Sequence, residues 1–301
     1  MTRLSLPASA ADTKGTRIGR LLAAAAMTSA MSLAVVGAAS AGTVLGTFTT
    51  SVLGANDDGS AGPVVLPFTA NFFGTNYTSL FVNNNGNVTF GGALSAYTPL
   101  GVAGGYSGLP IISPFFADVD TRGAASGLVT YGNGVYDGHT AFGVEWPHVG
   151  YFDAKSDKLN TFELILTDRA DTGAGNFDIF FNYNQIKWET GDFSGGAGGL
   201  GGSSAAVGFS NGTGAPGTFF QFDGSLAPGA FLDGGPNSLV AGTNNNLPGQ
   251  YLFQVRNGGV IVPPIGGVVP EPATWAMMIL GMGGIGALIR RRRNPVQAAT
   301  A

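Results

Sequence analysis

Apolar and polar residues alternate in several short stretches in the middle of the chain, and this period of two predicts β-strands. Phe142, Val144 and Trp146 alternate with Gly, Glu and Pro, and residues 177–183 follow the same pattern. Each of these strands is expected to bury one face. Further strands are expected at residues 80–82, 88–90, 161–167 and 251–255. No part of residues 44–256 shows a sustained helical period.

Turn-forming residues separate these stretches. The sequence Asn83-Asn84-Asn85-Gly86-Asn87 lies between two apolar runs, and Asn-Gly in such a place predicts a hairpin because both residues tolerate positive φ. Glycine supplies 50 of the 301 residues. Short strands with Gly- and Asn-rich turns predict a mainly β, sandwich-like single extracellular domain over residues 42–256. A surface loop is expected at 191–204, and a Gly/Pro linker at 257–269.

The N-terminal residues have the pattern of a secretory signal. Arg3, Lys14, Arg17 and Arg20 precede an apolar run that starts at Leu21 and ends in small residues. Cations, an apolar helix and an A-x-A site are typical of a signal peptide. We therefore expect a signal peptide at residues 1–41, with the small residues Ala39 and Ala41 of Ala39-Ser40-Ala41 directing cleavage after Ala41. A second membrane anchor is the alternative interpretation, and the small-residue exit argues against it.

The C-terminal residues have the pattern of a membrane helix. Residues 273–289 form a run of 17 uncharged positions, which as a helix would span about 26 Å, close to the hydrocarbon core of a bilayer. Trp275 lies at one end of the run, where an indole favours the headgroup region. The cations Arg290, Arg291, Arg292 and Arg293 lie at the other end, so residues 294–301 are expected to be a cytoplasmic tail.

Two prolines precede this helix. Pro270 and Pro272 bracket Glu271 and favour an extended backbone, a shape that a protease or transpeptidase can bind. Pro270-Glu271-Pro272, Trp275-Ala276, the glycine-rich span and the arginine cluster together resemble the PEP-CTERM sorting signal of Gram-negative bacteria, here over residues 270–293. The resemblance implies recognition by an exosortase, transient anchoring in the inner membrane and removal of the tail. Many proteins with this signal accompany exopolysaccharide production.

Charge is distributed unevenly along the chain. Eight of the 14 Lys and Arg residues lie in the two terminal signals, and 16 of the 18 acids lie in residues 42–270. This segment has six cations against sixteen acids, a formal charge of −10. Such a surface repels nucleic acid, so no nucleic-acid partner is expected, and it favours cations. The chain has no cysteine, which excludes disulfides, a thiol nucleophile and a thiolate metal site.

The middle of the chain resembles a second family. The resemblance rests on residues 112–121 (ISPFFADVDT), 142–146 (FGVEW), 160–166 (NTFELIL), 176–183 (NFDIFFNY) and 186–191 (IKWETG). These segments are similar to the nidogen-like (NIDO) extracellular domain of matrix and cell-surface proteins, over about residues 70–256. The resemblance implies extracellular adhesion or matrix association without a known catalytic apparatus.

Asp118 and Asp120 are the best candidates for metal ligands. In a D-x-D sequence on a strand both carboxylates lie on the same face, about 7 Å apart. Ca²⁺ prefers such oxygen ligands, although the rest of an EF-hand loop is missing from the sequence. The alternative is that the two carboxylates cap the strand end or pair with Arg122 or Arg169. Calcium is thus a possible cofactor, and no other is expected.

Catalytic candidates are weak. Glu145 with Glu163 could form a glycosidase pair, but charged positions on an outward strand face explain both more simply. His139 and His148 lack a third ligand at metal spacing. The glycines of residues 191–202 contain both G-D-x-S-G-G and G-x-G-x-x-G patterns, yet neither has the base or the helix that its chemistry needs.

The sequence therefore predicts an exported, non-enzymatic bacterial protein of the cell surface or biofilm matrix. Its expected roles are cell adhesion or association with exopolysaccharide, and its expected partners are an exosortase, exopolysaccharide and other surface proteins. A secreted hydrolase of the matrix glycan and a self-assembling coat protein are the alternatives.

Overall fold

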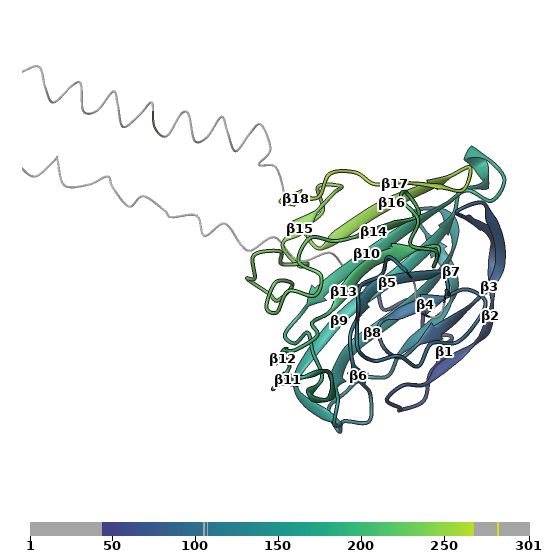
Figure 1. Cartoon of the computed structure of the whole chain (residues 1–301). Coiled ribbons are helices and arrows are strands. Elements are labelled where there is room, and N and C mark those ends of the chain that lie inside the picture. Colours follow the sequence, from purple (N-terminus) through teal and green to yellow (C-terminus); the bar gives the residue numbers. More distant parts are fainter. Residues whose placement is uncertain (1–43, 105, 107, 268–281, 283–301) are drawn as a thin grey trace, which may run out of the picture. The chain divides into compact units, whose positions relative to one another are not determined.

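Two antiparallel sheets form most of the described chain (Figure 1). The computed structural model describes residues 44–104, 106, 108–267 and 282. The predicted signal peptide, the sorting residues Pro270, Glu271, Pro272, Trp275 and Arg290 to Arg293, and the predicted cytoplasmic tail lie outside these residues, as does the predicted membrane helix except for Met282. No helix in the part of the chain that the structure describes is long and apolar enough to cross a membrane. The mainly β, sandwich-like prediction is confirmed.

The larger sheet has eight strands in the order β1-β7-β8-β9-β10-β16-β17, with β6 paired to β8. Their bounds are β1 Ser51–Val52, β6 Val119–Asp120, β7 Thr130–Tyr136, β8 His139–Tyr151, β9 Lys155–Asp168, β10 Phe177–Gln185, β16 Gln250–Arg256 and β17 Gly259–Ile261. The smaller sheet has six strands in the order β14-β13-β5-β4-β3-β2. Their bounds are β2 Ser60–Phe72, β3 Thr75–Asn83, β4 Asn87–Thr89, β5 Ile111–Phe116, β13 Ala206–Ser210 and β14 Phe219–Gln221.

Short elements complete the fold. Within the predicted surface loop at 191–204, β11 (Gly196–Ala197) pairs with β12 (Leu200–Gly201). Two 3₁₀ turns, η1 (Ala170–Thr172) and η2 (Asp192–Ser194), follow β9 and β10. Near the C-terminal end β15 (Gly242–Thr243) pairs with β18 (Gly266–Gly267). Because β17 and β18 both lie in the predicted linker of 257–269, much of that segment is part of the folded domain.

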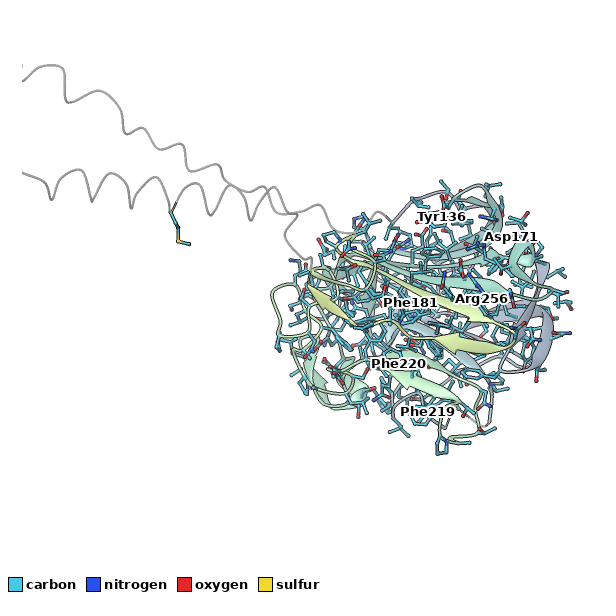
Figure 2. The ribbon with its side chains drawn as sticks, turned by 90° about the horizontal axis from the view of Figure 1, so that it is seen from above. Tyr136, Asp171, Phe181, Phe219, Phe220 and Arg256 are labelled. Carbon is cyan, nitrogen blue, oxygen red and sulfur yellow. The ribbon has the colours of Figure 1, made fainter. Side chains whose placement is uncertain are left out.

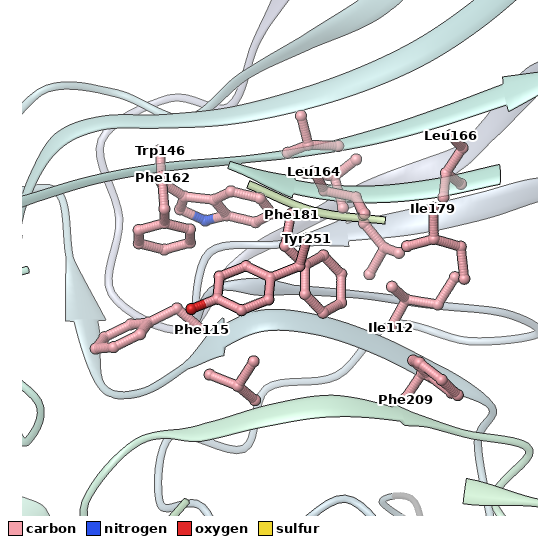
Figure 3. Close-up of a cluster of buried hydrophobic side chains, with 14 of the residues drawn as sticks. Ile112, Phe115, Trp146, Phe162, Leu164, Leu166, Ile179, Phe181, Phe209 and Tyr251 are labelled. Atoms are coloured by element: carbon pink, nitrogen blue, oxygen red, sulfur yellow. The ribbon is translucent and has the colours of Figure 1, made fainter. Parts of the chain in front are cut away.

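The core lies between the two sheets and is rich in aromatic rings (Figure 3). Phe115 of β5 lies 5.3 Å from Phe162 of β9, measured between ring centroids. Phe209 of β13 lies 5.3 Å from Phe253 of β16. These contacts join one sheet to the other, and in face-to-face packing of this kind the inward side chains of both sheets form the core. The predicted inward faces of the 142–146 and 177–183 strands are confirmed.

The outer face of the larger sheet is also buried, which the alternation did not predict. Phe48 packs there with Ala141, Ile165 and Phe180, and its side chain is fully buried. Glycines at β7 and β8 make room for this ring, since a Cβ at Gly143 would overlap it. The segment that precedes β1 thus covers the second face of the sheet.

Candidate functional site

Loops from distant parts of the chain meet at one end of the sandwich. The Asn84 side-chain amide donates hydrogen bonds to the carbonyl oxygens of Asp57 and Val119, in the loop before β2 and in β6. Asn85 Oδ1 accepts a 2.9 Å hydrogen bond from the backbone N–H of Val119. The backbone N–H of Phe152, after β8, donates to the carbonyl oxygen of Asp118 at 3.1 Å. The Asn-rich turn therefore joins the loops that carry the acidic residues.

The hairpin at this turn is confirmed, but its asparagines do more than allow a tight turn. Asn83, Asn84, Asn85 and Asn87 are all buried. Asn83 Nδ2 donates to Asn87 Oδ1 at 2.8 Å, and Asn85 Nδ2 donates to Asp58 Oδ1 at 2.8 Å. Buried amides need such partners because an unpaired polar group in the interior is costly. The buried asparagines thus bond to one another and hold the loops that carry the acidic residues.

Asp118 is the most unusual side chain of this region. It is 1% exposed, and neither carboxylate oxygen has a hydrogen-bond partner among the described residues. Gly191 packs directly against it, since a Cβ at that position would overlap the carboxylate. Burial raises the pKa of Asp118 to about 8, and the nearby charges of Asp57 and Asp58 act in the same direction. Asp118 thus retains a proton near neutral pH when nothing else neutralises it.

Asp57 and Asp58 bring two more carboxylates to Asp118. One oxygen from each of the three side chains lies within 4.8 Å of the others. Asp57 Oδ1 is buried without a partner among the described residues, and burial raises the pKa of Asp57 to about 6. Reasoning from the sequence missed both residues. The signal that could have found them was a pair of adjacent acids in a short Gly/Asn loop directly before a strand.

The D-x-D spacing predicts that Asp118 and Asp120 belong to one ligand group. The structure separates them, since Asp118 groups with Asp57 and Asp58. Arg122 Nε donates to Asp120 Oδ1 at 2.8 Å, and Arg122 Nη2 donates to Asp120 Oδ2 at 2.6 Å. Burial opposes ionisation of Asp120, but the hydrogen bonds from Arg122 outweigh it and hold its pKa below the usual range. The alternative interpretation of the sequence, a pair with Arg122, describes Asp120. It does not describe Asp118.

The lysines and arginines of the domain have carboxylate partners, and Arg122 has its partners within the acidic cluster itself. All six Lys and Arg side chains between residues 42 and 267 form ion pairs with carboxylates other than Asp118. Arg169 and Arg256 share Asp178, and Arg169 also pairs with Asp171; Figure 2 labels Arg256 and Asp171 of this network. Asp118 therefore forms no ion pair among the described residues, and the nearby charge of Arg122 lowers its pKa by less than burial raises it.

Aromatic rings form the wall of the hollow above the acids. Tyr97, Phe152 and Phe193 line a cavity of about 180 Å³ together with Asp58 and Asp118. Phe193 makes edge contacts with Tyr97 and Phe152, at centroid distances of 5.7 and 5.6 Å, yet 68% of it is exposed. Exposed rings beside polar groups are suited to stack on the apolar face of a sugar or another flat ligand.

A larger hollow, of about 610 Å³, lies beside β14. Phe220, Tyr251 and the segment 262–266 line it, so the C-terminal end of the domain forms one wall. Figure 2 shows Phe219 and Phe220 on β14 at this side of the domain. Its lining contains one ionisable carboxylate, Asp223, and no cluster of acids or histidines within the described residues.

The other sequence candidates do not form a site. Glu145 and Glu163 are directly opposite each other on β8 and β9 and lie on the outer face of the sheet, as expected, but the segment around Phe48 covers this face and both side chains are buried. Glu145 Oε1 accepts a 2.9 Å hydrogen bond from the backbone N–H of Phe48, within the covering segment. His139 and His148 belong to no group of potential metal ligands among the described residues.

Comparison with known proteins gives two family matches. Residues 78–140 and 130–257 match the nidogen-like domain, and residues 268–293 match the PEP-CTERM protein-sorting motif. The chain is similar to alpha-tectorin of Mus musculus, 32% identical over 221 residues, which cover 66% of this chain and 10% of that protein. It is also similar to nidogen of Drosophila melanogaster, 28% identical over 210 residues, which cover 61% of this chain and 14% of that protein. No solved structure matches.

These matches cover the domain and the C-terminal signal separately. The chain spans about a tenth of the length of the alpha-tectorins it matches. The nidogen-like match includes Asp118 and the Asn-rich turn, whereas Asp57 and Asp58 precede it. Together the two matches indicate an exported, extracellular or cell-surface protein. The chain belongs to the nidogen-like domain family, and it carries a PEP-CTERM sorting motif.

Proposed function

We propose that this protein is exported, sorted by an exosortase and placed at the cell surface or in the extracellular matrix, where its domain binds exopolysaccharide. The observation that carries the proposal is the presence of a nidogen-like domain and a PEP-CTERM motif on one chain. The first is an extracellular module, and the second directs the chain to a transpeptidase after export. Transient anchoring in the inner membrane through residues 273–289 would precede release or attachment.

The aromatic wall around Phe193 is the surface that fits a glycan best. It combines an exposed ring with acceptor carboxylates and lies at the end of the sandwich where distant chain segments meet. Sugar rings present an apolar face for stacking and hydroxyl groups for polar contacts, so both parts of this surface would be used.

Retention of the purified chain on exopolysaccharide from the producing bacterium tests this proposal. Wild-type protein should be retained, and Phe193→Ala should weaken retention at least about fivefold because stacked rings contribute on the order of 1 kcal/mol. Phe219→Ala, which removes a 38% exposed ring on β14, is the matched control and should bind like wild type. Equal binding by both variants would rule out the Phe193 surface, and absence of wild-type retention would rule out glycan binding.

The two alternatives make different predictions. A glycan hydrolase would release sugars during the same incubation, but the Glu145–Glu163 pair is covered by the segment around Phe48 and is closed to a polymer. A coat protein would self-assemble, which light scattering detects. The edge strand β2 contains Pro63 and Pro67, and prolines on an edge oppose pairing with another chain.

A further inference from the structure

Three carboxylate oxygens in the loops around the Asn-rich turn are buried but have no hydrogen-bond partner among the described residues. They are both oxygens of Asp118 and Oδ1 of Asp57. Asp118 also lines the cavity of about 180 Å³, so its unpaired carboxylate adjoins space that a ligand could enter. Native proteins pair nearly all buried polar atoms, and an exception at a cavity indicates a place where a water molecule or an ion binds.

The spacing of the oxygens fits a single cation. The ligand oxygens of Asp57, Asp58 and Asp118 lie within 4.8 Å of one another. Calcium binds oxygen at about 2.3–2.6 Å, so two oxygens on opposite sides of one ion are separated by about 4.6–5.2 Å. Three hard oxygen ligands without His or Cys favour calcium or magnesium over zinc.

Surrounding side chains hold the carboxylates in place while leaving an oxygen of each free to coordinate. Asn85 Nδ2 donates to Asp58 Oδ1 at 2.8 Å, and Arg122 Nη2 binds Asp57 Oδ2 at 2.8 Å. These contacts resemble the outer-shell hydrogen bonds that orient ligands in metal sites. Asp118 is fixed by close packing against Gly191.

The charge of the cluster also favours a dication. Asp57, Asp58, Asp118 and Asp120 bring four carboxylates together, and Arg122 is the cation that pairs with this group. We propose that Asp57, Asp58 and Asp118 bind one calcium ion, and that water in the adjoining cavity completes its coordination. This site differs from the D-x-D pair of the sequence, because Asp120 serves as the partner of Arg122. The proposal does not depend on glycan binding.

Calorimetric titration of the full-length chain with calcium chloride, after treatment with EDTA, tests the site. We expect one ion per chain with a Kd of about 10⁻⁴–10⁻³ M, the range of extracellular calcium modules. Thermal unfolding in about 10 mM calcium should show a raised Tm, because an ion that binds the folded state stabilises it. EDTA should reverse the shift. Magnesium requires near-ideal octahedral geometry and should bind at least about tenfold more weakly.

Three variants separate this site from general charge effects. Asp118→Asn and Asp58→Asn should each weaken calcium binding at least about tenfold and abolish most of the Tm shift, whereas the exposed Asp223→Asn should behave like wild type. Asp58 is partly exposed, so its variant decides the matter if Asp118→Asn does not fold. The proposal is wrong if wild type shows neither heat nor a Tm shift, if all three variants respond like wild type, or if magnesium binds more tightly than calcium.

Discussion

Gly86, in the Asn-rich turn at residues 83–87, packs against Phe115 of β5. Its φ is +75°, and a Cβ there would overlap the carbonyl oxygen of Phe115. Gly138, in the turn between β7 and β8, has a φ of +77°, but a Cβ at that position would have nothing within 4 Å. Alanine at either position would have a strained backbone, but only alanine at position 86 would also clash with a neighbour. Comparing the two variants therefore isolates the free-energy cost of the clash.

Gly86→Ala should destabilise the protein more than Gly138→Ala. Both variants lose about 1–2 kcal/mol from the left-handed backbone conformation, and Gly86→Ala should lose at least about 2 kcal/mol more because the turn must move away from Phe115. Denaturant unfolding followed by tryptophan fluorescence measures both free energies. Equal losses would show that the contact with Phe115 is not restrictive.

Glu163 makes the stability of the fold depend on pH. Burial raises its pKa to about 8, with a further contribution from Glu145, against an ordinary value of 4.5. Between these values the folded chain holds a proton that the unfolded chain releases, so the free energy of unfolding should fall as pH rises from about 4.5 to about 8. Each unit of pKa difference corresponds to about 1.4 kcal/mol.

Glu163→Gln should remove much of this pH dependence. Glutamine resembles the protonated acid, so the variant should match wild type near pH 5 and be more stable by a few kcal/mol near pH 9. Unfolding free energies of both proteins in EDTA, measured across this range, give the comparison. Parallel pH curves would show that Glu163 ionises normally in the fold.

Individual site residues could be predicted only in part. The D-x-D sequence made Asp118 a candidate ligand, which stays a prediction, but paired it with Asp120 on one strand, whereas β6 begins only at Val119. Asp57 and Asp58, which group with Asp118, lie about sixty residues earlier, and the fold alone brings them together. The sequence offered a pair with Arg122 as an alternative for both aspartates, but it could not tell that Asp120 forms this pair and Asp118 does not, because side-chain direction in a two-residue strand depends on the loops around it.

Strands were predictable where one face enters the core, because a period of two is a local property of the sequence. The second buried face was not predictable. It depends on the segment around Phe48, which contacts Glu145 across 97 residues of sequence. That distant cover also explains why Glu145 and Glu163 are buried although they alternate with core residues.

Phe48→Ala tests how far this covering segment stabilises the sheet. The ring is fully buried against Gly143 and Gly134, so its loss should lower the free energy of unfolding by about 3–5 kcal/mol. Val52→Ala, at a 54% exposed position in β1, should change it by less than about 0.5 kcal/mol. Similar values for the two variants would show that the segment packs loosely.

At the scale of the molecule, the domain and the sorting motif are close neighbours in the chain. The last described strand, β18, ends at Gly267, and the sorting match begins at residue 268. Residues 257–269 were expected to form a Gly/Pro linker, partly stiff and partly flexible, that follows the domain. Pairing of β17 with β16 and of β18 with β15 stabilises part of this segment through contacts that its own sequence does not specify.

No linker residue lies between the last described strand and the sorting match. We therefore expect cleavage of the C-terminal segment to depend on the residues of the motif itself. Glu271 is the charged group between two prolines, and a transpeptidase that recognises these residues requires a partner for its carboxylate. Glu271→Ala should therefore leave most of the chain full-length and membrane-associated, whereas Thr274→Ala, at a variable position of the PEPxxWA pattern, should be processed like wild type. Immunoblots of membrane and secreted fractions measure both outcomes. Normal processing of Glu271→Ala would show that the exosortase does not bind this carboxylate. Loss of processing in both variants would show that recognition depends on the segment as a whole and not on Glu271 in particular.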